Sequence, residues 1–253
     1  MSREEMLMRR DEYAVMFQVE DNYWWYRGLR TLLQQALARY APPNAMILDA
    51  GCGTGANLQI LQAHGRAIGI DISEEAIEFC RARGIPQDRA FMASVTDLPF
   101  PDELFDLAVS FDVICNIPDD VATFAEIGRV LKPGGRLITQ LPAYQWLWST
   151  HDVAVGHQRR YSARELRAKV TRAGLEIERL THTNALFLPF VIAGRLARRR
   201  ALGNGQAVQS DLTTPLPRPV NDSLGALVAA EMRAVARVNF PVGLSVLVVA
   251  RKR

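Results

Sequence analysis

The fold is indicated most specifically by one segment, Ile47-Leu48-Asp49-Ala50-Gly51-Cys52-Gly53-Thr54-Gly55. Its apolar start predicts a short buried strand, and the glycines predict a tight turn that leads into a helix over residues 56–63. Glycines in such a turn allow a ligand to lie directly against the backbone. Gly51, Gly53 and Ala56 also fit the dinucleotide-binding pattern, but this pattern alone does not identify the ligand.

Two carboxylates near this turn narrow the choice of ligand. Asp49 ends the expected strand, where its charge would repel a pyrophosphate at the helix N-terminus and attract a cationic amino group. Asp71 ends the next expected strand ~20 residues later, the position from which an acid accepts hydrogen bonds from ribose hydroxyls. The pattern therefore indicates a nucleoside that carries an amine.

Short apolar segments alternate with amphipathic ones on both sides of this turn. Strands are expected at 46–48, 67–70, 90–93, 105–110, 137–141, 175–180 and 242–250. Helices are expected at 4–19, 26–40, 56–63, 74–83, 120–131, 163–173 and 223–238, with an apolar helix after residue 185. Lys132-Pro133-Gly134-Gly135 is expected to stop one helix and turn before the next strand. The alternation predicts an α/β fold built from parallel βαβ units.

Four segments together carry a resemblance to a known family. They are LDAGCGTG at 48–55, GID at 69–71, DLPFPDELFDLAVS at 97–110 and LKPGG at 131–135. With them, residues 45–141 resemble the class I S-adenosylmethionine-dependent methyltransferases, in particular the small-molecule group that includes the ubiquinone-biosynthesis C-methyltransferases. The resemblance implies a Rossmann-like, seven-stranded, mostly parallel sheet with helices on both faces. It also implies S-adenosylmethionine as cofactor and S-adenosylhomocysteine as product.

The resemblance implies roles for individual positions. Asp49 and the glycines would hold the methionine moiety, Asp71 the ribose, and Ser94 with Val95 the adenine, while residues 110–113 would face the sulfonium and the acceptor. Many members have an acid where Ser94 stands, which leaves Asp97 as an alternative adenine contact. The residues expected at the cofactor are Asp49, Gly51, Cys52, Gly53, Thr54, Gly55, Asp71, Ile72, Ser94, Val95, Ser110 and Phe111.

A loop after the fifth expected strand gathers aromatic and basic residues between positions 146 and 161. Loops beyond the carboxyl ends of parallel strands are where such folds bind ligands. His151 and His157 are the expected catalytic residues, since a neutral imidazole can take a proton from a hydroxyl or amine; the alternative is that both are structural. Arg159-Arg160-Tyr161 predicts a clamp for a carboxylate or phosphate, or else exposed arginines before a helix capped by Ser162.

A second aromatic cluster is DNYWWYR at 21–27. Four successive aromatic residues cannot all face one core, so one face is left for a ligand or lid. Some bacterial relatives of the resembled family pair a similar segment with a His-Asp, Gly-His, Arg-Arg-Tyr loop, and we expect the two clusters to meet over the sulfonium. Alternatively, Trp24 and Trp25 only anchor the helices. The residues expected at the acceptor are Tyr23, Trp24, Trp25, Arg27, Asp112, Trp146, Arg159, Arg160 and Tyr161, although Asp112 could equally be a surface acid.

The pattern divides the chain into four parts. Residues 1–40 are expected to form a helical cap, 41–184 the cofactor-binding core, 185–240 a helical insertion and 241–253 the final strand of the core. The insertion holds an apolar helix that ends in Arg198-Arg199-Arg200, followed by a Gly/Pro-rich stretch at 203–219. It could line an acceptor pocket, form a dimer contact, or touch a membrane surface weakly; a packed helix with a basic end is the expected form.

Composition excludes several classes of protein. The 253 residues carry a net charge of +3, and the ten-residue apolar stretch at 185–194 is too short for a transmembrane span. No nucleic-acid partner is expected, because the basic segment is local and no binding module is recognised. The three cysteines and four histidines show no metal-ligand spacing. Without a secretory signal, a cytoplasmic monomer or homodimer is expected.

These observations predict a methyltransferase that acts on oxygen or nitrogen of a small, acidic or lipophilic acceptor in secondary or specialised metabolism. One alternative is a protein that binds S-adenosylmethionine without transferring the methyl group. Another is an NAD-dependent oxidoreductase, which Asp49 disfavours.

Overall fold

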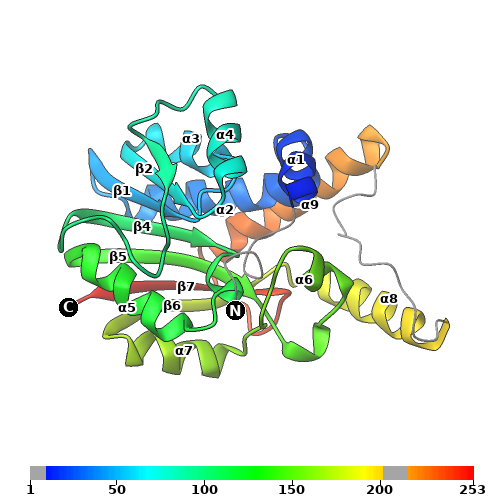
Figure 1. Ribbon diagram of the computed structural model, residues 1–253. Coiled ribbons are helices and arrows are strands. Elements are labelled where there is room, and N and C mark those ends of the chain that lie inside the picture. Colours follow the sequence, from blue (N-terminus) through cyan, green and yellow to red (C-terminus); the bar gives the residue numbers. More distant parts are fainter. Residues whose placement is uncertain (1–9, 202–215) are drawn as a thin grey trace.

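The computed structural model describes residues 10–201 and 216–253, and its centre is a seven-stranded sheet in the order β3-β2-β1-β4-β5-β7-β6 (Figure 1). Neighbours among the first five strands pair in parallel, whereas β7 is antiparallel to both β5 and β6. The strands are β1 Ala45–Ala50, β2 Gly65–Asp71, β3 Ala90–Met92, β4 Phe105–Phe111, β5 Leu131–Pro142, β6 Leu175–Thr183 and β7 Ser245–Lys252. The expected Rossmann-like, mostly parallel sheet is confirmed.

Helices cover both faces of this sheet (Figure 1). Ser73, Asp119 and Ser162 each begin a helix by accepting a hydrogen bond from a backbone N–H three residues later. The helices are α1 Arg10–Val19, α2 Trp24–Tyr40, α3 Ala56–Gln62, α4 Glu74–Ala82, α5 Asp120–Val130, α6 Thr150–Ala154, α7 Ala163–Arg172, α8 Leu188–Ala201 and α9 Arg218–Val235. The Ser162 cap agrees with the sequence interpretation, whereas α6 was not expected.

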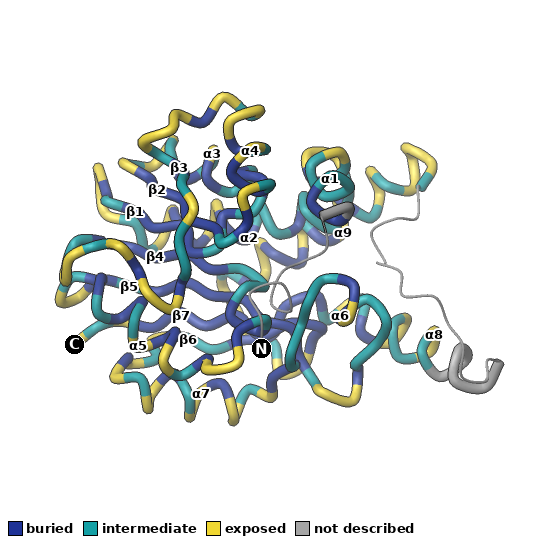
Figure 2. The backbone as a smooth tube through the Cα atoms, in the orientation of Figure 1, coloured by how far each residue is buried: buried dark blue, intermediate teal, exposed yellow. Residues whose placement is uncertain are grey.

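Alternating strand residues build two cores, one on each face, and the strands are buried along most of their length (Figure 2). In β1, Leu48 belongs to the core that includes side chains of α5 and α7, whereas Ile47 belongs to the core that includes side chains of α2, α3, α4 and α9. Burial on both faces explains why these strands are continuous apolar runs in the sequence.

The segment Lys132-Pro133-Gly134-Gly135 differs from its expected form. β5 begins at Leu131, so these residues lie inside the strand as an irregularity, where the pairing with β4 shifts from Phe105–Leu131 to Leu107–Arg136. Gly134 has a φ of +80°, which a glycine adopts without strain. Lys132 Nζ lies 2.7 Å from Asp106 Oδ1 and fixes the irregularity to β4. The Lys-Pro-Gly-Gly segment therefore forms a bulge within β5, instead of the turn between a helix and a strand that was expected.

The segment after residue 185 contributes a helix to the layer beside α2. Val228 of α9 packs against Gly28 of α2, and Asn221 accepts a hydrogen bond from the Trp24 backbone at 2.9 Å. α9 therefore covers the sheet together with α2, although sequence analysis placed it in an insertion. Most of the Gly/Pro-rich stretch and the side chains of Arg198, Arg199 and Arg200 lie outside what the structure describes. Among residues 10–201 and 216–253, no helix is long and apolar enough to span a bilayer.

Candidate active site

The glycine-rich turn connects β1 to α3 at the carboxyl edge of the parallel strands. Gly51 and Cys52 donate backbone hydrogen bonds to Ile70 O at 2.9 and 2.8 Å, which tie the turn to β2. Gly51 has a φ of +88°, and a Cβ there would lie 2.3 Å from Val113 Cγ2. A side chain at this position would therefore be strained and would push away the segment that follows β4.

Asp71 ends β2 and faces the turn. Its Oδ2 accepts a hydrogen bond from Gly53 N at 3.0 Å, and its Oδ1 accepts bonds from Ser73 N at 3.0 Å and the Tyr13 hydroxyl at 3.5 Å. Burial raises the pKa of Asp71, while the backbone donors oppose that shift. The carboxylate is thus held in a fixed orientation at the edge of the turn.

Asp49 lies beneath the turn in β1 and is 2% exposed. Within the described part of the chain, its Oδ2 is buried without a hydrogen-bond partner. Burial and the negative charge of Asp71 raise the pKa of Asp49 to about 7. This arrangement fits the amine-bearing nucleoside expected from the sequence, because a cation held at the turn would lower the cost of ionising Asp49. Asp49 itself does not line the cavity, so its effect on a ligand there would be electrostatic.

Helix α1 crosses over the turn. Glu20, just after α1, accepts a hydrogen bond from the Thr54 hydroxyl and pairs with Arg83 of the segment after α4 at 2.6 Å. Phe17 of α1 stacks on Phe79 of α4 with 4.7 Å between ring centroids. The chain before α2 is therefore fastened to the same loop and strand end that would hold the cofactor.

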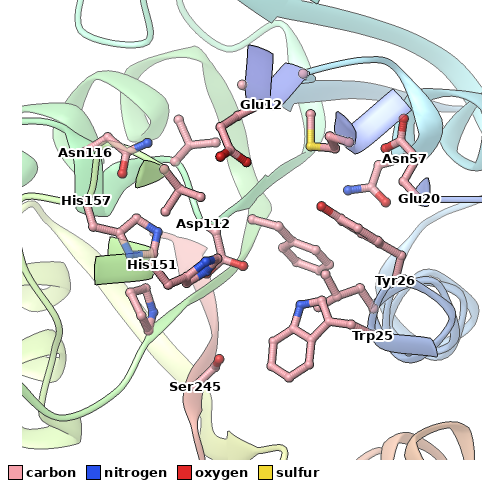
Figure 3. Close-up of a pocket in the computed structure, with 18 of the residues that line it drawn as sticks. Glu12, Glu20, Trp25, Tyr26, Asn57, Asp112, Asn116, His151, His157 and Ser245 are labelled. Atoms are coloured by element: carbon pink, nitrogen blue, oxygen red, sulfur yellow. The ribbon is translucent and has the colours of Figure 1, made fainter. Parts of the chain in front are cut away.

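A cavity of about 1020 Å³ begins at the glycine turn and Asp71 and continues between α1, α2, α6 and α8 (Figure 3). Most of the residues expected at the site line it. From the cofactor set they are Gly51, Cys52, Gly53, Thr54, Asp71, Ile72, Ser94, Val95 and Phe111, and from the other sets Tyr23, Trp24, Trp25, Asp112, His151, His157 and Arg160. The two clusters from residues 21–27 and 151–161 thus meet at one cavity.

Six further expected site residues, besides Asp49, do not line this cavity. Gly55 is the N-cap residue of α3, and Ser110 donates a hydrogen bond to Ala50 O at 2.9 Å. Arg27 pairs with Asp222 at 2.7 Å, which joins α2 to α9. Trp146 is 55% exposed and stacks on Tyr144.

The remaining two, Arg159 and Tyr161, bind a carboxylate of the protein itself. Asp120 of α5 lies 3.0 Å from an Arg159 nitrogen and accepts a hydrogen bond from the Tyr161 hydroxyl at 2.9 Å. Arg159 and Tyr161 thus contact a carboxylate of the protein, and the anion clamp expected at residues 159–161 stays a prediction. Asp97 does not line the cavity either.

Asp152 binds both Arg160 and His157. The carboxylate is fully buried and accepts hydrogen bonds from Arg160 Nε at 2.7 Å, Arg160 Nη2 at 3.0 Å and His157 Nδ1 at 2.9 Å. Burial opposes ionisation of Asp152, but these donors lower its pKa well below the usual range. Burial would likewise lower the pKa of His157, yet Cys115, Asp152 and Asp112 raise it to about 10. The neighbouring carboxylates Asp152 and Asp112 thus favour the protonated form of His157, whereas a general base requires the neutral form.

Asp112 projects from the end of β4 into the cavity, near Asn116, His151 and His157 and across from Trp25 and Tyr26 (Figure 3). Its φ of +55° lies in the left-handed region, and its N–H is held by Gln140 O at 2.9 Å. Burial raises the pKa of Asp112 to about 6, whereas the charges of His157 and Arg160 lower it. In the described residues, no donor is hydrogen-bonded to this carboxylate, which leaves it available to a ligand.

Sequence reasoning missed several groups at this site. Tyr13 and Glu20 reach it from α1, where no motif marks them, and Phe187 and Phe190 reach it near α8. Asp152 had a usable signal, since an acid five residues before a histidine in a short loop is a natural partner for that histidine.

Comparisons with known proteins agree with this geometry. Residues 48–139 match the family described as "Methyltransferase domain". The chain is 32% identical over 162 residues to a "Probable S-adenosylmethionine-dependent methyltransferase" of Mycolicibacterium smegmatis, covering 63% of this chain and 62% of the relative. It is 37% identical over 138 residues to a demethylmenaquinone methyltransferase of Symbiobacterium thermophilum, covering 51% and 53%.

A solved structure of a SAM-dependent methyltransferase from Thermotoga maritima superposes with a TM-score of 0.61 at 21% identity, covering 96% of each chain, and so supports the fold. The chain spans between half and two thirds of the length of the two relatives above. Over the matched residues the chain is therefore similar to S-adenosylmethionine-dependent methyltransferases, and its fold agrees with that similarity.

Proposed function

We propose that this protein transfers a methyl group from S-adenosylmethionine to a hydroxyl oxygen or an amine nitrogen of a small, lipophilic acceptor. One observation carries the proposal: a single cavity joins the glycine turn and Asp71 to a wall that contains Asp112 and a group of aromatic side chains. The cofactor and the acceptor can therefore lie in contact, as an in-line displacement requires.

The cofactor half of the cavity would use groups whose orientation is already fixed. Asp71 offers carboxylate oxygens to two ribose hydroxyls, the backbone at Gly51 and Gly53 lets the ligand approach closely, and Val95 offers an apolar contact to the base. Asp49 would favour a positive charge at the turn. When bound, S-adenosylmethionine supplies a methyl group on a positively charged sulfur.

The acceptor half of the cavity is largely aromatic and aliphatic. The apolar side chains on this side are Trp24, Trp25, Phe187, Phe190, Val191 and Leu244. Such a wall excludes water and binds an aromatic or aliphatic body through burial of apolar surface. The arginines expected to recognise an acidic group are engaged by Asp120 and Asp152, so the lipophilic alternative is the one we retain.

Asp112 is the group that we assign to receive the acceptor's proton. The O–H or N–H bond of the acceptor breaks, the proton passes to an Asp112 carboxylate oxygen, and the freed lone pair forms the bond to the methyl carbon. The electron pair of the old carbon–sulfur bond remains on sulfur. A pKa of about 6 places Asp112 close to the working pH of a general base. His151 stays a second candidate, since it lines the same wall.

Calorimetric titration with S-adenosylhomocysteine and with NAD tests the cofactor assignment. Asp71→Ala should weaken S-adenosylhomocysteine binding at least tenfold, because the ribose loses its hydrogen-bond acceptor, whereas Asp88→Ala should leave it unchanged because Asp88 is exposed. NAD binding without S-adenosylhomocysteine binding would overturn the proposal.

A methyl-transfer screen tests the reaction, with lipophilic phenols, alcohols and amines as acceptors. Turnover of members of this panel, reduced at least tenfold in Asp112→Asn, is the expected result. Tight cofactor binding with no turnover of any acceptor would instead favour a protein that binds the cofactor without transferring its methyl group.

A further inference from the structure

The loop between α6 and α7 contains a buried charge network that the methyl-transfer chemistry does not use directly. Asp152 has its oxygens occupied by His157, Arg160 and the Ser149 backbone, the last at 2.8 Å. Asp152 contributes one negative charge, whereas His157 and Arg160 contribute two positive ones. The network therefore presents a net positive charge to its surroundings.

His157 is the part of this network that is fixed as a cation. Its Nδ1 is hydrogen-bonded to Asp152 Oδ1 at 2.9 Å, and its side chain is 8% exposed. The hydrogen bond to Asp152 fixes the orientation of the ring and favours its protonated form. The positive charge of His157 acts on other side chains that line the same cavity.

Asp112 is the carboxylate on which this charge acts, since it lies near His157 on the wall of the same cavity (Figure 3). The charged and titratable groups that act on it are Tyr26 of α2, Cys115 in the short 3-10 helix at Ile114–Asn116, and Asp152, His157 and Arg160 of the loop. His151 of α6 and Glu12 of α1 line the same cavity. Burial raises the pKa of Asp112, His157 and Arg160 lower it, and the negative charge of Asp152 raises it.

We propose that Asp152 and His157 are a positioning pair for Asp112: Asp152 holds His157 as an imidazolium, and that fixed charge keeps the Asp112 carboxylate ionised on the cavity wall. The inference rests on the proposed function, in which Asp112 receives the acceptor's proton. It changes the role of His157 from a base, as the sequence suggested, to the cation that makes another residue a base. Neither member of the pair needs to touch the acceptor.

Direct titration of Asp112 tests the pair without any turnover. We would record ¹³C spectra of the whole protein labelled at the aspartate carboxyl carbons, and assign Asp112 by its absence in Asp112→Asn. In His157→Gln the Asp112 titration should move up by about one pH unit or more, because a neighbouring positive charge is removed. Asp152→Asn should move it up by less than His157→Gln does, because His157 loses the partner that favours its protonation while the negative charge of Asp152, which itself raises the pKa of Asp112, is also removed.

Two further variants control this experiment. His157→Lys keeps a positive charge at the position and should return the titration toward the wild-type value. Lys169→Gln also removes a positive charge that is paired with a buried carboxylate, but that carboxylate is Asp120, so the Asp112 titration should not change. S-adenosylhomocysteine binding at wild-type strength would verify that each variant is folded.

The pH profile of kcat/KM gives the corresponding result for turnover. The acid limb should move to higher pH in His157→Gln and Asp152→Asn by the same amount as the Asp112 titration. An Asp112 titration that does not move in His157→Gln would overturn the pair. A titration that moves as expected, in a protein that methylates no acceptor, would instead leave the pair standing and overturn the proposed function.

Discussion

Asp49 is a residue whose placement costs the folded protein stability. Its carboxyl is buried, and one oxygen has no hydrogen-bond partner within the described residues. A side chain of this kind destabilises the fold, because replacing it by a neutral group removes the cost of burying a charge. The ionised carboxylate of Asp49 therefore lowers the stability of the ligand-free fold, whereas the proposed function uses its negative charge.

Asp49→Asn should stabilise the ligand-free protein in a pH-dependent way. The pKa of Asp49 is about 7 in the folded chain and about 4 in an unfolded one, so the folded state binds the proton more tightly. The wild type therefore loses stability as the pH rises from about 4 to about 7, and the loss stays complete above that range. Asparagine avoids this loss, which amounts to at most about 4 kcal/mol at pH 8.

Thermal unfolding at pH 4.5 and pH 8 measures this effect. The melting temperature of Asp49→Asn should exceed that of the wild type at pH 8, by an amount that shrinks at pH 4.5, while its S-adenosylhomocysteine affinity falls. Asp88→Asn, whose side chain is 70% exposed, should show neither change. An equal difference at both pH values would mean that Asp49 is not buried in its charged form.

At the scale of elements, the contact between α2 and α9 decides how the aromatic cluster is presented to the cavity. Gly28 allows the two helices to approach, and Asn221 and Asp222 hold Trp24 and Arg27 at the start of α2. Trp24 then lies 4.9 Å from Phe187, measured between ring centroids. A helix that sequence analysis assigned to an insertion thus supports one wall of the site.

Gly28→Ala should destabilise the protein, although alanine is normally the better helix residue. The new Cβ would lie 2.0 Å from Val228 Cγ1, and overpacking of this kind costs about 1–3 kcal/mol. Gly194→Ala in α8 has nothing within 4 Å and should be neutral or stabilising by about 0.5–1 kcal/mol. Urea unfolding of both variants makes the comparison, and partial recovery in Gly28→Ala/Val228→Ala would assign the loss to this contact.

At the scale of the whole molecule, the cavity lies between the sheet and the helices that cross its carboxyl edge. α1 is held there by Glu20, which binds Thr54 of the glycine turn and Arg83, and by the stacking of Phe17 on Phe79. Tyr13 reaches Asp71 from the same helix. The cofactor is therefore expected to enter and leave only when these contacts open.

Arg83→Gln should speed this exchange, because Glu20 loses a partner in an ion pair whose two side chains are each 7% exposed. We expect the dissociation rate of S-adenosylhomocysteine to rise about tenfold or more, the change that corresponds to a loss of about 1.4 kcal/mol. Arg89→Gln, which removes an exposed ion pair with Asp88, is the matched control. Stopped-flow tryptophan fluorescence can follow the exchange, since Trp24, Trp25 and Trp148 line the cavity. An unchanged rate would show that α1 does not control access.

The sequence predicts the parts of this molecule that depend on local patterns. The alternating strands and helices, the glycine turn and Asp71 at the end of β2 all follow from residues close together in the chain. The bulge at residues 132–135 does not, because its form depends on Asp106 in the neighbouring strand. The contacts of His157 and Arg160 could not be predicted for the same reason: both side chains bind Asp152, and spacing alone does not reveal that this partner is buried.

The position of β7 has a consequence for how the chain assembles as it is synthesised. β7 lies between β5 and β6, yet both neighbours leave the ribosome before it. Until residues 245–252 emerge, β5 and β6 each present an open backbone edge, the kind of surface on which chains aggregate. Nascent chains that stall before residue 245 would therefore expose the unpaired backbone groups of β5 and β6 that β7 normally binds. Addition of β7 pairs both strands in one step.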